Sequence, residues 1–141
     1  MARADVASVV LEQIGEALGT AGIAIAEVDE DRQLVNLTAS RGYSDDVVEQ
    51  WRDTPLDMAT PGNQAVRRRA LLFFESIASL QDEYPDVVEG LADTGHASFL
   101  FVPLVAGRRA HGLLVVSWAE PNALSSDERR FVQILAGLTS D

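Results

Sequence analysis

Apolar residues recur at helical spacing near both ends of the chain. Residues 5–18 carry an apolar stripe with polar residues elsewhere, which predicts an amphipathic helix. Near the other end, Ser125 and Glu128 have the spacing of a capping box, and an amphipathic helix is predicted over residues 126–140. The first stripe is expected to consist of Val6, Val9, Val10, Ile14, Ala17 and Leu18.

Between these helices, short runs rich in β-branched residues predict strands. The expected strands are residues 23–28, 34–40, 71–75, 97–104 and 110–118. In the second strand Val35, Leu37 and Ala39 alternate with polar residues, as on a half-buried strand. A polar turn at residues 29–31 and a turn around Gly107 join the first two and the last two strands. Each of these pairs is therefore predicted to be a β-hairpin.

Helix signals also occur in the middle of the chain. Ser44 and Thr60 are predicted N-caps, and Pro61 is suited to a first helical position. The first of these helices is expected to end before residues 54–55, and the second to run to about residue 68. Residues 76–84 are expected to form a loop with a helical turn, followed by a helix over residues 85–94.

This order of elements predicts an α+β fold with helices on both sides of a central sheet, an α/β/α arrangement of layers. The two hairpins make the sheet at least partly antiparallel. The length of 141 residues and the absence of repeats or low-complexity linkers favour a single domain over residues 1–141. Because helices are predicted at both ends, we expect this domain to be part of a longer protein.

The composition argues against several classes of function. The chain has 22 acidic and 11 basic residues, a net charge of -11, which disfavours binding to nucleic acid or to an anionic membrane. No apolar run approaches the ~18 residues of a membrane span, so we expect a cytoplasmic protein. There is no cysteine and no lysine, which removes disulfides, thiol catalysis and Schiff-base or P-loop lysines.

Residues 95–118 carry the most distinctive motif of the chain. The motif has a Val-Pro-Leu strand end at residues 102–104, a basic turn at residues 107–109 and a returning strand that contains Gly112. Together with the closing helix, this stretch resembles the GAF domain, a sensory module of bacterial signalling proteins. Residues 55–85 are similar to the subgroup found in actinobacterial phosphatases of the PP2C/SpoIIE type and in sensor histidine kinases.

The resemblance implies a central antiparallel sheet of five or six strands. It implies terminal helices on one face of the sheet, and short helices and loops around a small-molecule pocket on the other face. It further implies a homodimer formed through the helices near residues 5–18 and 126–140, and coupling to an output domain in the same polypeptide.

Several chemistries of this family can be tested against the residue types. Without cysteine, neither covalent bilin attachment nor the thiol chemistry of methionine sulfoxide reductases is available. Without lysine, the Asn-Lys-Phe-Asp-Glu signature of the cyclic-nucleotide subgroup is incomplete.

His96 and His111 are the only candidate haem ligands, and we interpret both as ordinary edge residues. Arg67, Arg68 and Arg69 could hold an anion, but their place at a helix C-terminus explains them without a ligand. We therefore expect no catalytic residue, metal or cofactor.

Aromatic residues are the best candidates for ligand contacts. Phe99 and Phe101 share one face of their predicted strand, and Trp118 ends the neighbouring strand. Trp51 and Tyr84 lie in the segments expected to cover this sheet. A pocket lined by these five side chains would suit a small apolar or aromatic ligand, and plain core packing is the alternative.

The sequence thus predicts a regulatory domain that is not an enzyme. It would bind a small molecule noncovalently, mediate dimerisation, or both, and so control an attached phosphatase or kinase. The alternative is a purely structural dimerisation module without a ligand.

Overall fold

The computed structural model describes residues 3–121, 125–131 and 134. Six strands form one sheet in the order β3-β2-β1-β6-β5-β4, and every neighbouring pair is antiparallel. The elements are α1 (Arg3–Leu18), β1 (Gly22–Asp29), β2 (Leu34–Arg41), α2 (Asp45–Gln50), β3 (Asp53–Pro55), α3 (Pro61–Arg68), β4 (Leu72–Phe74), α4 (Ile77–Glu83), α5 (Val88–Ala92), β5 (Ser98–Ala106) and β6 (Arg109–Trp118).

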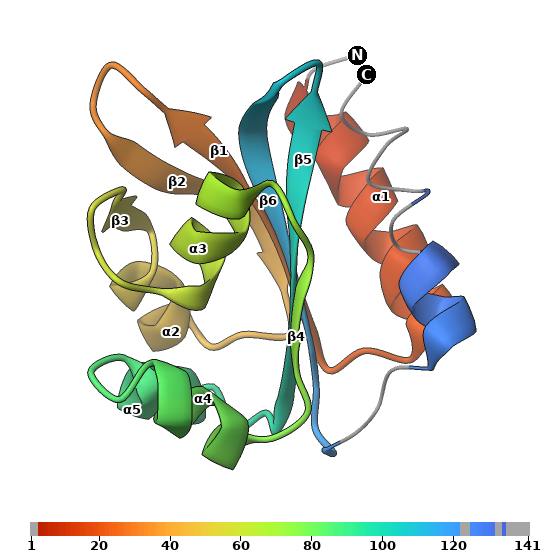
Figure 1. The fold of residues 1–141 in the computed structure, drawn as a ribbon. Coiled ribbons are helices and arrows are strands. Elements are labelled where there is room, and N and C mark those ends of the chain that lie inside the picture. The colour runs from red at the N-terminus through yellow and green to blue at the C-terminus, as the bar shows by residue number, and fades with distance from the viewer. Residues whose placement is uncertain (1–2, 122–124, 132–133, 135–141) are drawn as a thin grey trace.

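The helices cover both faces of the sheet, as predicted. Figure 1 shows α1 and the helical residues 126–131 on one face, and α2 to α5 on the other. The core is correspondingly divided into two clusters. One cluster packs α1 on residues such as Leu100 and Val116, and the other packs the middle helices on residues such as Phe99 and Phe101. Because strand side chains alternate, neighbouring residues of β5 belong to different clusters.

The buried face of α1 agrees with the predicted stripe at Ile14 and Leu18 and differs from it at Val9 and Ala17, while the side chains of Val6 and Val10 lie outside the described part of the chain. Leu11, Ile14 and Leu18 face the sheet, and Leu11 is only 1% exposed. Val9, in contrast, is 46% exposed, and Ala17 is also exposed. The bulkier Leu11 buries more apolar area than a valine or an alanine, so it sets the side of the helix that faces the sheet.

Three predicted elements in the middle of the chain were wrong in type or extent. Residues 53–55 form the edge strand β3, which pairs with β2 and was predicted only as a helix end. A three-residue strand is too short to show alternation, and its proline is tolerated at a sheet edge. Residues 77–83 form a full helix, α4, where a loop with a helical turn was expected, and α5 spans only Val88–Ala92 of the predicted 85–94.

An irregularity in β2 changes which side its residues face. Ile25 pairs with Ala39, but the next residue, Ala26, pairs with Leu37, so Thr38 is an extra residue. The Thr38 hydroxyl donates to the carbonyl of Ile25 over 3.0 Å. As a result Val35 packs on the side of the middle helices and Ala39 on the side of α1, whereas simple alternation had predicted one shared face.

The predicted capping box at the C-terminal helix is confirmed. The Ser125 backbone N–H donates to Glu128 Oε1 over 3.0 Å, and the Glu128 N–H donates to Ser125 Oγ over 3.1 Å. Residues 126–131 and 134 are helical, and the remainder of the predicted helix, including residues 135–140, lies outside the described residues. In the part of the chain that is described, none of the helices is long and apolar enough to span a bilayer.

Candidate ligand pocket

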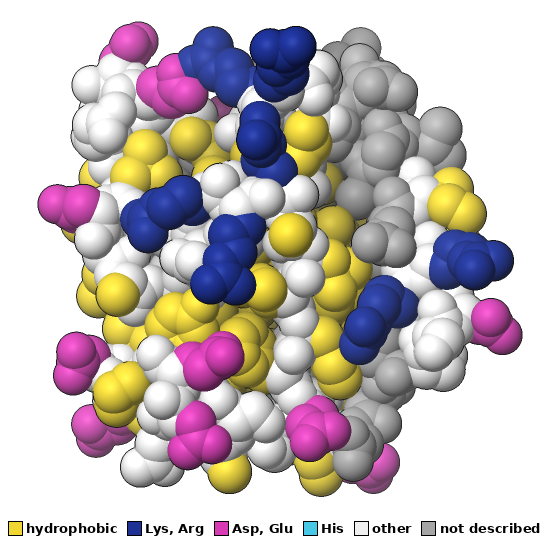
Figure 2. Space-filling model, in the orientation of Figure 1, with side chains coloured by type: hydrophobic (Ala, Val, Ile, Leu, Met, Phe, Trp, Pro, Cys, Tyr) yellow, Lys and Arg dark blue, Asp and Glu magenta, His cyan; other side chains and the backbone are white. Residues whose placement is uncertain are grey.

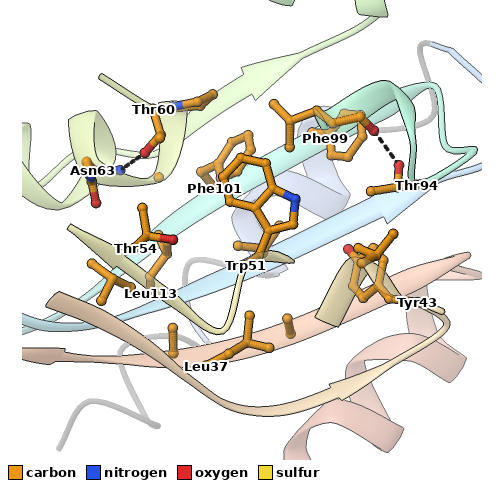
Figure 3. Close-up of a pocket in the computed structure, with 18 of the residues that line it drawn as sticks. Leu37, Tyr43, Trp51, Thr54, Thr60, Asn63, Thr94, Phe99, Phe101 and Leu113 are labelled. Atoms are coloured by element: carbon orange, nitrogen blue, oxygen red, sulfur yellow. Dashed lines mark hydrogen bonds between the residues drawn. The ribbon is translucent and has the colours of Figure 1, made fainter. Parts of the chain in front are cut away.

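A cavity of about 100 Å³ lies between the sheet and the middle helices. Its floor comes from β1, β2, β5 and β6, and its walls come from α2, α3 and α5 (Figure 3). Its surface is almost wholly apolar, and no charged side chain is among its lining residues. An apolar cavity of about 150 Å³ is known to bind benzene, and the cavity here is smaller but of the same order of volume.

The floor combines small and aromatic side chains. Ala24 and Ala26 of β1 leave room that larger strand residues would fill. On β5, the rings of Phe99 and Phe101 lie nearly parallel, with their centroids 6.3 Å apart and an interplanar angle of 14°. These two rings reach the same side because they are two residues apart on one strand.

The start of α3 forms one wall. As predicted, Thr60 is its N-cap, and the Thr60 hydroxyl accepts from the Asn63 backbone N–H over 3.0 Å. The Asn63 side-chain amide donates to the carbonyls of Pro55 and Met58, each over 2.8 Å, which ties the preceding loop to the helix. A Cβ at Gly62 would lie 2.7 Å from Leu113 Cδ2, so a glycine allows α3 to approach the floor closely.

Trp51, at the C-terminal end of α2, forms the opposite wall. A Cβ at Gly90 would lie 3.0 Å from Trp51 Cζ2, so this glycine makes room for the indole ring. Among the side chains that the structure describes, only the Trp51 Nε1–H is a buried polar group without a hydrogen-bond partner. Leaving such a donor unpaired costs about 1–3 kcal/mol.

At one end of the pocket, three side chains form a hydrogen-bond network. Ser117 Oγ lies 2.7 Å from the Tyr43 hydroxyl and 2.7 Å from His96 Nδ1. Burial raises the pKa of Tyr43 to about 12, against the opposing effect of the Ser117 hydrogen bond, and burial lowers the pKa of His96. A Cβ at Gly22 would lie 2.6 Å from the Tyr43 ring, so glycine permits this contact. Since Ser117 is 0% exposed, the network holds the strands together rather than presenting a nucleophile.

The structure brings together three of the five predicted aromatic contacts. Trp51, Phe99 and Phe101 line the cavity. Tyr84 does not: it packs edge-on against Phe74, with ring centroids 5.8 Å apart.

The predicted place of Trp118 in this pocket is wrong. Its indole N–H donates to the Leu18 carbonyl over 3.1 Å, and its ring packs edge-on against Phe73 on the side of α1. The reason is the alternation of side chains along β6. Leu113 and Val115 face the pocket, whereas Val116 and Trp118 face α1.

Sequence reasoning missed Tyr43 and Thr94, which also line the cavity. Neither shows a periodic pattern, because both lie in connections between elements. The paired alanines at positions 24 and 26 were the available signal, since small residues on one face of a strand leave space above it. His96, interpreted as an edge residue, takes part in the network that holds Tyr43.

The three consecutive arginines lie at the C-terminal end of α3, where the sequence placed them. Arg67 and Arg68 lie in the last turn of α3, and Arg69 Nη1 donates to the Arg108 carbonyl over 2.6 Å. Figure 2 shows dark blue side chains over and above α3, and hydrophobic side chains at the surface between α3 and α4. Within the described ranges, no three His, Asp or Glu side chains are grouped closely enough to hold a metal ion.

A six-stranded antiparallel sheet with terminal helices on one face and an apolar pocket on the other defines a class of α+β domains. A family model described as the GAF domain matches residues 1–141. The chain therefore belongs to the GAF domain family, and the expected resemblance is confirmed.

Solved structures share this fold at low sequence identity. The GAF domain of an Acinetobacter phosphoenolpyruvate-protein phosphotransferase is 20% identical, with a TM-score of 0.80 over 99% of this chain and 81% of that one. A domain of a two-component sensor histidine kinase protein from Sinorhizobium meliloti, described as putative, is also 20% identical, with a TM-score of 0.80 over 99% of this chain and 89% of that one.

The same fold occurs in an enzyme. A type II free methionine-R-sulfoxide reductase from Thermoplasma acidophilum is 13% identical, with a TM-score of 0.78 over 97% of this chain and 88% of that one. The fold alone thus does not separate regulation from catalysis. No curated protein matches the chain significantly.

Proposed function

We propose that this GAF domain is a regulatory module that binds a small uncharged molecule noncovalently in the pocket between the sheet and α2, α3 and α5. The observation that carries the proposal is the cavity of about 100 Å³ with its apolar lining. Packed protein interiors contain few voids larger than a water molecule, so a pocket of this size offers room for a small ligand. The chain has neither cysteine nor lysine, so attachment of a ligand through a thiol or a Schiff base is unavailable.

Binding would act by favouring one of two arrangements of the domain, and so control an attached output domain such as a kinase or phosphatase in the cytoplasm. The ligand must bind the two arrangements with different affinity, because otherwise it shifts no equilibrium. The occurrence of the fold in a sensor histidine kinase protein and a phosphotransferase supports this role.

A thermal-shift screen with uncharged small molecules tests the proposal, with Ala24→Leu as the matched control that fills the cavity. A ligand at 100 times its dissociation constant stabilises the folded state by about 2.7 kcal/mol. We expect compounds that raise the melting temperature of the wild-type domain and leave that of Ala24→Leu unchanged. Equal shifts in both proteins, or no shift with any compound, would count against the proposal.

Dimerisation is a second proposed role, supported by a separate observation. Among the described residues, four large hydrophobic side chains are exposed, and three of them lie on the terminal helices. Val9 is 46% exposed, Phe131 39% and Ile134 58%. The exposed parts of these side chains would be buried if the terminal helices of two chains packed together. In the absence of a ligand, the domain would then be a structural dimerisation module.

Light scattering over a range of concentrations tests this role. We expect the wild-type domain to form a dimer and Ile134→Glu to shift it to the monomer. Met58→Glu is the matched control, because Met58 is exposed to a similar degree but lies outside the terminal helices. A wild-type monomer at all concentrations, or equal effects of the two substitutions, would contradict this role.

A further inference from the structure

The unpaired indole N–H of Trp51 narrows the chemistry of the ligand. Buried polar groups in folded proteins almost always have a hydrogen-bond partner, so an exception requires an explanation. Trp51 lines the cavity, and its indole N–H is the buried polar group, among the described side chains, that has no hydrogen-bond partner. Figure 3 shows its nitrogen on the side of the indole that is turned toward Thr94 and Tyr43, which also line the pocket.

Other polar groups on the pocket wall are already engaged within the protein. The Thr94 hydroxyl donates to the Leu91 carbonyl over 2.6 Å and accepts from the His96 N–H over 3.1 Å. The hydroxyl of Tyr43 is held by Ser117, and the amide nitrogen of Asn63 has two carbonyl partners. The Thr54 and Thr60 hydroxyls also line the cavity, and the Thr60 hydroxyl accepts from the Asn63 backbone N–H. Among the described side chains of this wall, the Trp51 N–H is the buried donor without a partner, and this makes it the candidate for a bond to an occupant.

The other lining residues disfavour a charged ligand and favour a planar apolar one. No charged residue lines the cavity, so an ionised ligand would lose its hydration without gaining a counter-charge. Phe99 and Phe101, whose rings lie 14° from parallel, both line the cavity, and aromatic side chains pack favourably against a planar aromatic ligand.

We propose that the pocket takes an uncharged, planar aromatic molecule with a hydrogen-bond acceptor, and that the Trp51 Nε1–H donates to this acceptor. The inference rests on the proposed ligand-binding function and deepens it. A carbonyl or ether oxygen supplies the acceptor, and the phenylalanine rings hold the apolar body. A hydrocarbon of the same shape would leave the indole N–H unpaired and bind more weakly.

Three probes of matched shape separate these requirements. Acetophenone has the carbonyl acceptor, ethylbenzene has the same outline without an acceptor, and benzoate adds a negative charge. The domain labelled with ¹⁵N has two indole N–H signals, from Trp51 and Trp118. Because the Trp118 N–H already donates to the Leu18 carbonyl on the other face of the sheet, its signal is an internal control.

We expect acetophenone to bind about tenfold more tightly than ethylbenzene, the ratio that one hydrogen bond supplies. Acetophenone should move the Trp51 indole proton downfield and leave the Trp118 signal in place. Benzoate should not saturate the site. In Trp51→Phe, the preference for acetophenone should fall below about twofold, while an unchanged Trp118 signal verifies that the variant is folded.

Equal affinities of acetophenone and ethylbenzene, or a preference that persists in Trp51→Phe, would overturn this inference and leave the ligand-binding function standing. Saturable binding of benzoate at the pocket would also overturn it. Failure of both neutral probes to bind would count against the inference and the ligand-binding function together.

Discussion

Filling the cavity from its floor should stabilise the domain. Ala24 is buried on β1 and lines the cavity, so a longer side chain there enters empty space. Ala24→Leu adds three carbon atoms, and at about 0.8 kcal/mol per buried methylene group the gain is at most about 2.4 kcal/mol. The loss of leucine rotamer freedom removes about 0.5–1 kcal/mol. With some strain, we expect a net gain of about 1 kcal/mol in the free energy of unfolding.

Thermal unfolding followed by circular dichroism measures this gain. The unfolding entropy of a 141-residue domain is about 0.3 kcal/mol/K, so a gain of about 1 kcal/mol raises the melting temperature by about 3 °C. Ala65→Leu is the matched control, because Ala65 is buried in the packed cluster on the same side of the sheet and does not line the cavity.

Overpacking at Ala65 should cost about 1–3 kcal/mol and lower the melting temperature by about 3–10 °C. We therefore expect Ala24→Leu to raise the free energy of unfolding and Ala65→Leu to lower it. If Ala24→Leu destabilises the domain as much as Ala65→Leu, the space above Ala24 is not available, and the argument for a ligand at this site fails.

Three further substitutions or conditions test the surroundings of the pocket. Gly22→Ala would place a Cβ 2.6 Å from Tyr43 Cζ and 2.7 Å from His96 Cε1, and should lower the free energy of unfolding in urea by about 1–3 kcal/mol; an unchanged midpoint would show that the rings can move aside. Because burial lowers the pKa of His96 in the folded state, its contribution is complete above the ordinary histidine pKa of about 6.5 and is lost as the pH falls through the lower folded value. His96→Gln should therefore weaken the dependence of the urea midpoint on pH in this range, and an identical dependence in both proteins would refute the assignment. Thr60→Ala removes the side-chain cap of α3 and should cost about 1 kcal/mol, whereas no loss in calorimetry would mean that the cap is dispensable.

Local chemistry made much of the fold predictable. Ser44 and Thr60 accept hydrogen bonds from the backbone N–H groups of residues 47 and 63, as expected of N-caps. The two hairpins follow from turn residues between β-branched runs, and both are confirmed. These features depend on residues within a few positions of one another, so the sequence alone carries them.

The features that the sequence did not reveal depend on partners far along the chain. The side that Trp118 faces follows from the register of β6 with its neighbours, and the side that Ala39 faces follows from the bulge at Thr38. The edge strand β3 exists because residues 53–55 meet β2. The pocket was anticipated through Trp51, Phe99 and Phe101, but its shape required the tertiary structure.

The most direct test of the account is a titration of the ¹⁵N-labelled domain with acetophenone, followed by the backbone amide signals. Binding in the pocket should give saturable shifts at residues of β1 and β5 that border the cavity, such as Ala26 and Phe101, and at Trp51. The amides of α1, on the other side of the sheet, should change little. Shifts centred on α1, or no saturable shift at all, would contradict the claim that this pocket is a ligand site.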